Sequence, residues 1–231
     1  MPSILITGSN RGLGLEWARQ YAREGWRVFA TCRHPSEAKS LGELAETYAG
    51  LSIHRLDVTV VEDIRGLFWE LEKEPVDILL GNAGVYLDKN IAEFGSLCYH
   101  DWIRTLEINT MGTIRVAELF IENIARSQRR LIVAVSSHMG SIADIQDPGS
   151  YYYRSSKAAL NAAMQGLAVK LKPRGIGVLL LHPGGVKTRM GPPFGISAEE
   201  SVTGMRRIVE GFRLEEGTGR FVKYDLTPMP W

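Results

Sequence analysis

Short apolar runs alternate along this chain of 231 residues with longer segments whose apolar residues recur three and four positions apart. Runs of Val, Ile and Leu bounded by turn residues are typical of buried parallel strands, and the longer spacing is typical of amphipathic helices. The alternation predicts an α/β fold, a doubly wound Rossmann-type sheet of seven mostly parallel strands with helices on both faces. We expect strands at 3–7, 27–32, 51–56, 76–81, 130–136, 177–182 and 220–223, and helices at 15–24, 36–48, 60–73, 100–127 (with a break near Asn109), 152–171 and 198–212.

The composition fits one domain and excludes several classes of partner. The chain is long enough to bury one α/β core and no linker divides it, so we expect a single domain at 1–231. Its formal net charge of +1 favours neither nucleic acid nor an anionic membrane as a partner. Cys32 and Cys98 lack the spacing of metal ligands, so we expect no metal site. The absence of a signal-peptide pattern and of a transmembrane run favours a cytoplasmic protein.

A glycine-rich turn follows the first expected strand. The sequence reads Gly8-Ser9-Asn10-Arg11-Gly12-Leu13-Gly14 directly before a segment of helical periodicity. A strand, such a turn and a helix N-terminus place backbone N–H groups and the positive end of a helix dipole against a pyrophosphate. The spacing differs from the commoner G-x-G-x-x-G fingerprint, and the alternative interpretation is a flexible surface loop. We favour a dinucleotide-binding turn because a strand precedes it and a helix follows.

Tyr153 and Lys157 lie in the first turns of the long expected helix at 152–171. Residues four apart share one face of a helix, so both side chains point into the same volume. A fixed ammonium there is expected to lower the phenol's pKa from about 10, so that it can exchange a proton with an alcohol or carbonyl. Such a pair is weak evidence alone, because a solvated helix face is the ordinary interpretation. The glycine turn supplies the support that the pair needs.

Six motifs occur together in the order and approximate spacing of one enzyme family. They are Thr7-Gly8-x-x-x-Gly12-x-Gly14, Asn82-Ala83-Gly84, Asn109, Ser136-Ser137, Tyr153-x-x-x-Lys157 and Pro183-Gly184. On these residues the chain resembles the short-chain dehydrogenase/reductase family over essentially its whole length. Within that family it is similar to the group of C-factor and sniffer-type carbonyl reductases. It departs from the pattern at Gly81, where the family more often has Asn, and at Gly185, where close relatives often have Trp.

The resemblance implies an NADP(H)-dependent oxidoreductase that transfers a hydride reversibly between nicotinamide C4 and a small carbonyl or alcohol substrate. It implies that Ser137 and Tyr153 bind the substrate oxygen and that Lys157 holds the nicotinamide ribose. It also implies that Asn109 interrupts its helix and holds a water beside Lys157. Ser136 is the alternative catalytic serine, since the sequence alone allows either hydroxyl to face inward.

The residues that follow the second expected strand bear on the choice of dinucleotide. NAD-binding folds usually carry an acid there, whereas this chain has Arg33, with Arg11 in the glycine turn. Charge-assisted hydrogen bonds from these cations to a 2′-phosphate predict a preference for NADPH over NADH, unless both are ordinary surface residues. By resemblance, Asp57 binds the adenine amino group, although it could equally cap the next helix. The expected cofactor-binding residues are Gly8, Asn10, Arg11, Gly12, Leu13, Gly14, Arg33, Asp57, Val58, Asn82, Ala83, Gly84, Tyr153, Lys157, Pro183, Gly184, Val186 and Thr188.

The resemblance also raises questions of function and assembly. Similarity to C-factor, which is associated with intercellular signalling, leaves an alternative: an NADP(H)-binding signalling or redox-sensing protein with little turnover. All four catalytic positions carry the family's residue types, which favours an enzyme. The segment between Ser137 and Tyr153 is short, which leaves the helices of Asn109 and Tyr153 free to form a homodimer or homotetramer. We expect substrate specificity to reside in 86–95, 142–150 and a lid at 190–196.

Overall fold

All seven expected strands are present in one parallel sheet. The computed structural model describes residues 1–89 and 94–231. The strands are β1 (Ser3–Ile6), β2 (Arg27–Cys32), β3 (Leu51–Arg55), β4 (Ile78–Gly81), β5 (Leu131–Val135), β6 (Gly177–His182) and β7 (Arg220–Lys223). Their order is β3-β2-β1-β4-β5-β6-β7, and every pairing between them is parallel. The strand order reverses between β1 and β4, the point at which open α/β sheets bind their ligands.

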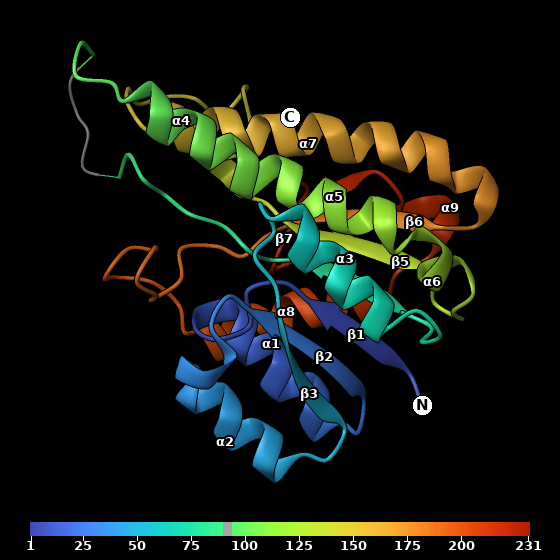
Figure 1. Cartoon of the computed structure of the whole chain (residues 1–231). Helices are drawn as coiled ribbons and strands as arrows, with labels where there is room; N and C mark the ends of the chain where they lie inside the picture. The colour runs from blue at the N-terminus through green and yellow to red at the C-terminus, as the bar shows by residue number, and fades with distance from the viewer. Residues whose placement is uncertain (90–93) are drawn as a thin grey trace.

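Helices cover both faces of the sheet, as Figure 1 shows. One face carries α1 (Gly12–Arg23), α2 (Lys39–Thr47) and α8 (Ala198–Glu210), and the other carries α3 (Val61–Glu70), α5 (Gly112–Leu119) and α7 (Tyr151–Leu171). Alternate strand residues enter the two cores: Ile4 and Ile6 pack toward α1 and α8, and Leu5 packs toward α3 and α5. This two-sided burial explains why the strands read as continuous apolar runs. None of the helices in the described ranges has the length and apolar character that a membrane crossing requires.

The helix expected at 100–127 is interrupted at Asn109, as predicted. It divides into α4 (Tyr99–Leu106), a π-helical turn at Glu107–Met111, α5, and α6 (Ile121–Ala125). A π-turn inserts one residue into the helical ladder and is often found at functional sites. Here it turns the fully buried Asn109 side chain toward β4 and α7. The short α9 (Leu214–Gly217) has no counterpart among the expected elements.

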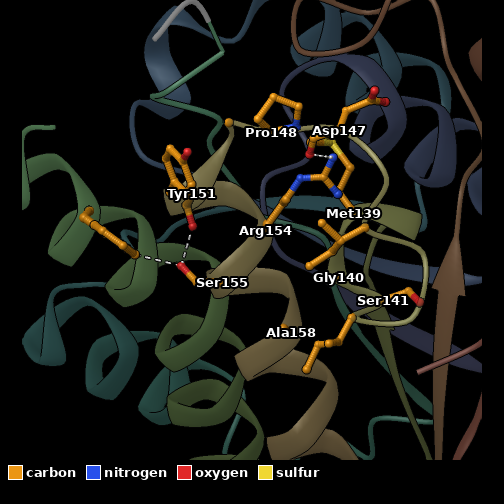
Figure 2. A pocket seen from close by; sticks show the side chains of 13 residues that line it. Met139, Gly140, Ser141, Asp147, Pro148, Tyr151, Arg154, Ser155 and Ala158 are labelled. Atoms are coloured by element: carbon orange, nitrogen blue, oxygen red, sulfur yellow. Dashed lines mark hydrogen bonds between the residues drawn. The ribbon is translucent and has the colours of Figure 1, made fainter. Parts of the chain in front are cut away.

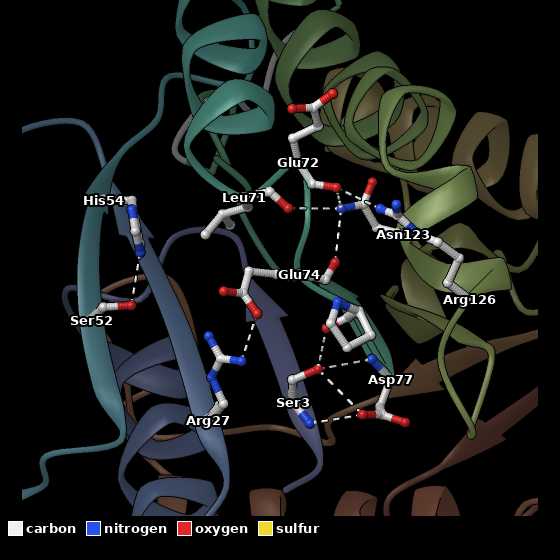
Figure 3. Close-up of polar contacts among 11 residues, drawn as sticks. Ser3, Arg27, Ser52, His54, Leu71, Glu72, Glu74, Asp77, Asn123 and Arg126 are labelled. Atoms are coloured by element: carbon white, nitrogen blue, oxygen red, sulfur yellow. Dashed lines mark hydrogen bonds and ion pairs between the residues drawn. The ribbon is translucent and has the colours of Figure 1, made fainter.

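Polar contacts fix the amino-terminal ends of the central strands. The Ser3 backbone N–H donates to Asp77 Oδ2 at 2.9 Å, which joins the starts of β1 and β4. The Asn123 side chain donates to the carbonyls of Leu71 and Glu74, both at 2.9 Å, and so closes the segment that follows α3 (Figure 3). A buried amide without a hydrogen-bond partner lowers the stability of the fold, so these contacts favour one register at the amino-terminal edge of the sheet. The candidate site lies at the opposite edge of the sheet, where the carboxyl ends of the strands are.

Candidate active site

The glycine turn between β1 and α1 has the shape of a cradle for an anion. Gly8 and Gly12 have φ angles of +71° and +54°, which residues with a Cβ rarely adopt. A Cβ at Gly14 would collide with the Gly8 carbonyl oxygen and would lie 2.6 Å from Asn82 Nδ2. The first turn of α1 contains no acidic residue, so no side chain there neutralises the positive end of its dipole. The backbone therefore fits a pyrophosphate group, as the sequence predicts.

The end of β4 packs directly against this turn. The Asn82 side chain donates to the carbonyls of Thr7 and Gly8, at 2.9 and 3.0 Å. Thr7 Oγ1 accepts from the backbone N–H groups of Asn82 and Ala83, each at 3.0 Å. These reciprocal bonds make the glycine turn and the Asn82–Gly84 motif one rigid unit. A dinucleotide that lies on the turn would therefore have both walls fixed in advance.

The departure at Gly81 has a local cause. A Cβ at this position would lie 2.5 Å from Thr113 Cγ2 and 2.7 Å from its Oγ1. Thr113, in α5, is itself buried against the sheet. Glycine at position 81 therefore lets α5 approach β4 closely.

Tyr153 and Lys157 meet beside this unit, in the first turns of α7. Both are nearly buried, with 8% and 4% of their surfaces exposed, so they are not part of a solvated helix face. Lys157 Nζ lies 5.8 Å from the centre of the Tyr153 ring and donates to the Val135 carbonyl at 2.9 Å. A Cβ at Gly84 would lie 3.8 Å from Lys157 Nζ, so the two predicted halves of the site adjoin. The phenol, the ammonium and the Asn82–Gly84 motif, which packs on the glycine turn, therefore lie close together, and their role as one catalytic site stays a prediction.

The electrostatics of this pair differ from the expectation. Burial raises the pKa of Tyr153 to about 12, the hydrogen bond from Ser137 lowers it in part, and Tyr86 adds to the rise. Burial also lowers the pKa of Lys157 to about 8. We expected Lys157 to make the phenol more acidic, and that prediction is wrong for this structure. Desolvation of the buried phenol is the largest effect on its pKa, and the Lys157 ammonium donates its hydrogen bond to Val135 rather than to the phenol.

The two serines after β5 point in different directions. Ser136 Oγ donates to Asn161 Oδ1 at 2.6 Å inside the fold, where neither side chain reaches solvent. Ser137 interacts through its hydroxyl with the Tyr153 phenol, and its Oγ accepts from the Met139 backbone N–H at 3.2 Å. β5 ends at Val135, so the strand's alternation of side-chain directions does not extend to Ser136 and Ser137. The sequence alone therefore could not decide which of the two hydroxyls faces the site. The geometry favours Ser137 beside the phenol.

Asn109 joins three elements at the back of the site. Its Oδ1 accepts from the Val85 N–H at 2.8 Å, and its Nδ2 donates to the Val85 carbonyl and to Ser156 Oγ, both at 2.9 Å. Both amide hydrogens are therefore in use, and the second lone pair of Oδ1 is left for a further donor. Oδ1 would lie 3.3 Å from a Cβ at Gly84, on the side of Lys157. The expected water beside Lys157 stays a prediction.

The two cations expected to select NADP lie in the glycine turn and directly after β2. Arg11 and Arg33 are exposed, and neither forms an ion pair within the described residues. Burial alone would raise the pKa of Asp57, but hydrogen bonds from Thr59 and the nearby charge of Arg33 hold it below its usual value. Asp57 Oδ1 accepts from the Thr59 N–H at 2.9 Å, so it closes a local turn. The interpretation of Asp57 as the cap of α3 is wrong, because the helix begins at Val61.

The loop after β6 lies against the glycine turn. A Cβ at Gly12 would lie 3.6 Å from Thr188 Cγ2, and Gly184 has a φ of +80°. The expected lid folds back onto this loop: the Lys187 N–H donates to the Ile196 carbonyl at 3.0 Å. Val186 is buried beneath this contact. The predicted residues Pro183, Gly184, Val186 and Thr188 thus border the same edge of the sheet.

Two residues near the phenol were not among the expected site residues. The Tyr86 ring stacks on the Tyr153 ring with centroids 4.3 Å apart and planes 20° apart. Asp88, only 2% exposed, accepts from the Tyr152 backbone N–H at 2.7 Å. Tyr86 and Asp88 are each more than 60 residues away in sequence from the α7 residues that they contact, so no local pattern could have indicated these contacts. Of the specificity segment expected at 86–95, residues 90–93 lie outside the described residues.

A pocket of about 440 Å³ lies on a different face of α7. Figure 2 shows that Tyr151, Arg154, Ser155 and Ala158 line it, together with residues of the 139–149 segment. Tyr153 and Lys157 do not contribute to its walls. The pocket and the Tyr153 phenol therefore lie on different faces of α7.

The chain is similar in sequence and fold to known oxidoreductases. The family model for short chain dehydrogenases matches residues 2–196. The C-signal protein of Myxococcus xanthus is 41% identical over 158 residues, which cover 68% of this chain and 93% of that protein. The carbonyl reductase Sniffer of D. melanogaster has a TM-score of 0.89 at 32% identity, with both chains covered completely. The NADPH-bound carbonyl reductase from chicken fatty liver has a TM-score of 0.91 at 28% identity, covering 100% of this chain and 99% of that one.

These similarities extend through every element that borders the site. The family model begins before the glycine turn and ends at Ile196, beyond Lys157 and Thr188. A match of this extent is not explained by a shared fold alone, because the Sniffer reductase is also 32% identical in sequence. The chain belongs to the short chain dehydrogenase family.

Proposed function

We propose that this protein is an NADPH-dependent carbonyl reductase whose catalytic residues are Ser137, Tyr153, Lys157 and Asn109. One observation carries the proposal: a buried phenol, a buried ammonium and a serine hydroxyl converge beside the rigid glycine turn. The solved carbonyl reductases described above support the choice of reaction, and one of them contains NADPH. The signalling alternative is not favoured, because a site for dinucleotide binding alone has no need of a buried Tyr–Lys pair.

The glycine turn would hold the pyrophosphate, and Arg11 and Arg33 would hold the 2′-phosphate. Both guanidinium groups are exposed and carry no ion pair in the described residues, so they are available to an anion. Lys157 would hold the nicotinamide ribose, and the backbone near Val186 with the hydroxyl of Thr188 would hold the carboxamide. When bound, NADPH supplies the hydride for the substrate's carbonyl carbon.

The protein's own residues would orient the carbonyl and supply the proton. The hydroxyls of Ser137 and Tyr153 bind the carbonyl oxygen, which polarises the C=O bond and stabilises the negative charge that develops on oxygen. Tyr153 then donates its proton to that oxygen. Burial raises the pKa of Tyr153 to about 12, so at neutral pH the phenol still carries the proton that the reduction consumes. Asn109 would guide the proton's return through a water.

The experiment is a screen of aldehydes, ketones and quinones with NADPH and with NADH, followed by Tyr153→Phe on the best substrate. The variant loses only a hydroxyl, so it should bind NADPH with unchanged Kd. Its kcat should fall by about 10² to 10⁴, the usual contribution of general acid catalysis. Near wild-type turnover by Tyr153→Phe would refute the assignment of the acid. Failure of the wild-type protein to bind NADPH would refute the proposed function itself.

A further inference from the structure

The catalytic helix α7 begins without a local cap. The chain enters it through Gly149 and Ser150, which have φ angles of +87° and +55°. A capping serine ordinarily has an extended backbone that lets its hydroxyl reach the N–H groups of the first turn. Ser150, in the left-handed conformation, makes no such hydrogen bond. The first turn of α7, which carries Tyr153, therefore needs an acceptor from elsewhere in the chain.

Asp88 supplies this acceptor from another element. Its Oδ2 accepts a hydrogen bond from the Tyr152 N–H at 2.7 Å, and its Oδ1 accepts a second one from the Tyr153 N–H at 3.3 Å. These are the second and third residues of the helix, the amides that a capping side chain normally binds. The carboxylate is almost fully buried and lies at the positive end of the dipole of a 21-residue helix. Asp88 is thus a long-range N-cap.

The same short segment also contacts the catalytic phenol and the loop after β6. Tyr86 stacks on the Tyr153 ring at 4.3 Å between centroids, and its hydroxyl lies 2.5 Å from Ser150 Oγ. Lys89 Nζ donates to the Gly191 carbonyl at 2.9 Å, within the expected lid. Residues 86–89 therefore connect the end of β4, the first turn of α7 and the lid.

We infer that Asp88 is a positioning residue that fixes the orientation of the Tyr153 phenol, and that residues 86–89 link this orientation to the lid expected at 190–196. The inference rests on the proposed function, because it assumes that Tyr153 is the acid. A backbone amide of Tyr153 itself is bound by Asp88, so any tilt of the first turn displaces the phenol. A misplacement of about 1 Å at a reacting group can cost about 10²-fold in rate.

The test compares Asp88→Ala with Asp88→Asn on the substrate found in the carbonyl screen. Asp88→Ala should lower kcat by about ten- to a hundredfold while the Kd of NADPH stays unchanged, because the glycine turn is untouched. Asp88→Asn should give a kcat between those of Asp88→Ala and wild type, because its one amide oxygen can accept from the Tyr152 N–H whereas its NH2 group cannot accept from the Tyr153 N–H. Should Asp88→Ala not fold, Asp88→Leu takes its place with the same expected fall, because its side chain fills a similar space and carries no acceptor.

The matched control is Asn123→Ala, which removes another buried long-range cap at the far edge of the sheet (Figure 3). It should lower thermal stability and leave kcat unchanged. Peptide-level hydrogen exchange over residues 150–156 should accelerate in Asp88→Ala and not in Asn123→Ala. Unchanged kcat in Asp88→Ala, no rescue by Asp88→Asn, or an equal fall in Asn123→Ala would each overturn the inference. If the wild-type protein reduces no carbonyl, the proposed function fails, and the exchange measurement still decides whether Asp88 caps α7.

Discussion

Replacing Lys157 with methionine should stabilise the folded protein at neutral pH while it abolishes turnover. Lys157 is 4% exposed, and within the described part of the chain its ammonium donates one hydrogen bond, to the Val135 carbonyl. Burial lowers its pKa from the ordinary value of 10.5 to about 8. The protein therefore holds a cation in a place where the charged form is disfavoured. Methionine has a similar length and no charge.

The expected gain follows from the size of this shift. A lowering from 10.5 to about 8 corresponds to about 3 kcal/mol of cost for the charged side chain near pH 7, at about 1.4 kcal/mol for each pKa unit. Lys157→Met removes this cost, but it also loses the hydrogen bond to Val135, which lowers the free energy of unfolding by about 1 kcal/mol. The free energy of unfolding should therefore rise by about 2 kcal/mol. For a chain of this size, Tm should rise by about 4–8 °C.

The pH dependence gives the prediction its sign. The unfolded chain keeps the Lys157 proton up to its ordinary pKa of 10.5, whereas the folded protein releases it near 8. Between these values the unfolded state binds more protons, so the wild-type protein gains stability as pH rises. The advantage of Lys157→Met should be full below about pH 8 and shrink between about 8 and 10.5; above that window Lys157→Met should be the less stable protein by about 1 kcal/mol, because only the lost hydrogen bond to Val135 then separates the two. Any change caused by ionisation of Tyr153 is common to both proteins.

Urea unfolding followed by tryptophan fluorescence, at about pH 7 and about pH 10, measures the two free energies. The control is Lys170→Met, the same exchange at an exposed position of α7, which should not stabilise. A Lys157→Met protein that is less stable than wild type at neutral pH would refute the reasoning. So would a difference in stability that does not change with pH.

Two further pairs of measurements separate alternatives that the sequence left open. Ser137→Ala should lower kcat by about 10²-fold, the usual effect of losing one donor to a developing oxyanion, whereas Ser136→Ala should keep kcat. Ser136→Ala should instead lose about 1–3 kcal/mol of stability, because Asn161 Oδ1 then stays buried without its donor. A fall in kcat for Ser136→Ala and not for Ser137→Ala would make Ser136 the catalytic serine. Arg33→Ala should raise the KM for NADPH about ten- to a hundredfold and leave the KM for NADH unchanged, as expected for one charge-assisted hydrogen bond to a 2′-phosphate. Equal effects on the two dinucleotides would exclude that contact.

The strands and the glycine turn could be predicted because their signals are local. A parallel strand buried on both faces must be apolar throughout, as Leu131–Val135 is, and a close backbone approach requires glycine, as at Gly14. The break at Asn109 was predicted from the resemblance to the family, and the indifferent helix propensity of asparagine is compatible with it.

Other features depend on distant parts of the chain. Asp88 caps α7 across more than 60 residues, and the pKa of Tyr153 is set by the protein that surrounds it rather than by the residue four positions along. The direction of Ser136 depends on Asn161, in a different element. The expected homodimer stays a prediction, which a molar mass from light scattering checks. Tertiary contacts of this kind have no period or spacing in the sequence.

The close approach of Gly81 and Thr113 matters for consensus engineering. Thr113 already fills the space that a side chain at position 81 would need, with its methyl group 2.5 Å from the place of a Cβ. Introducing the family's usual asparagine there by itself would push α5 off β4 and strain the adjacent π-turn that carries Asn109. Positions 81 and 113 consequently form a coupled pair, so asparagine at position 81 would damage the scaffold unless position 113 is changed with it.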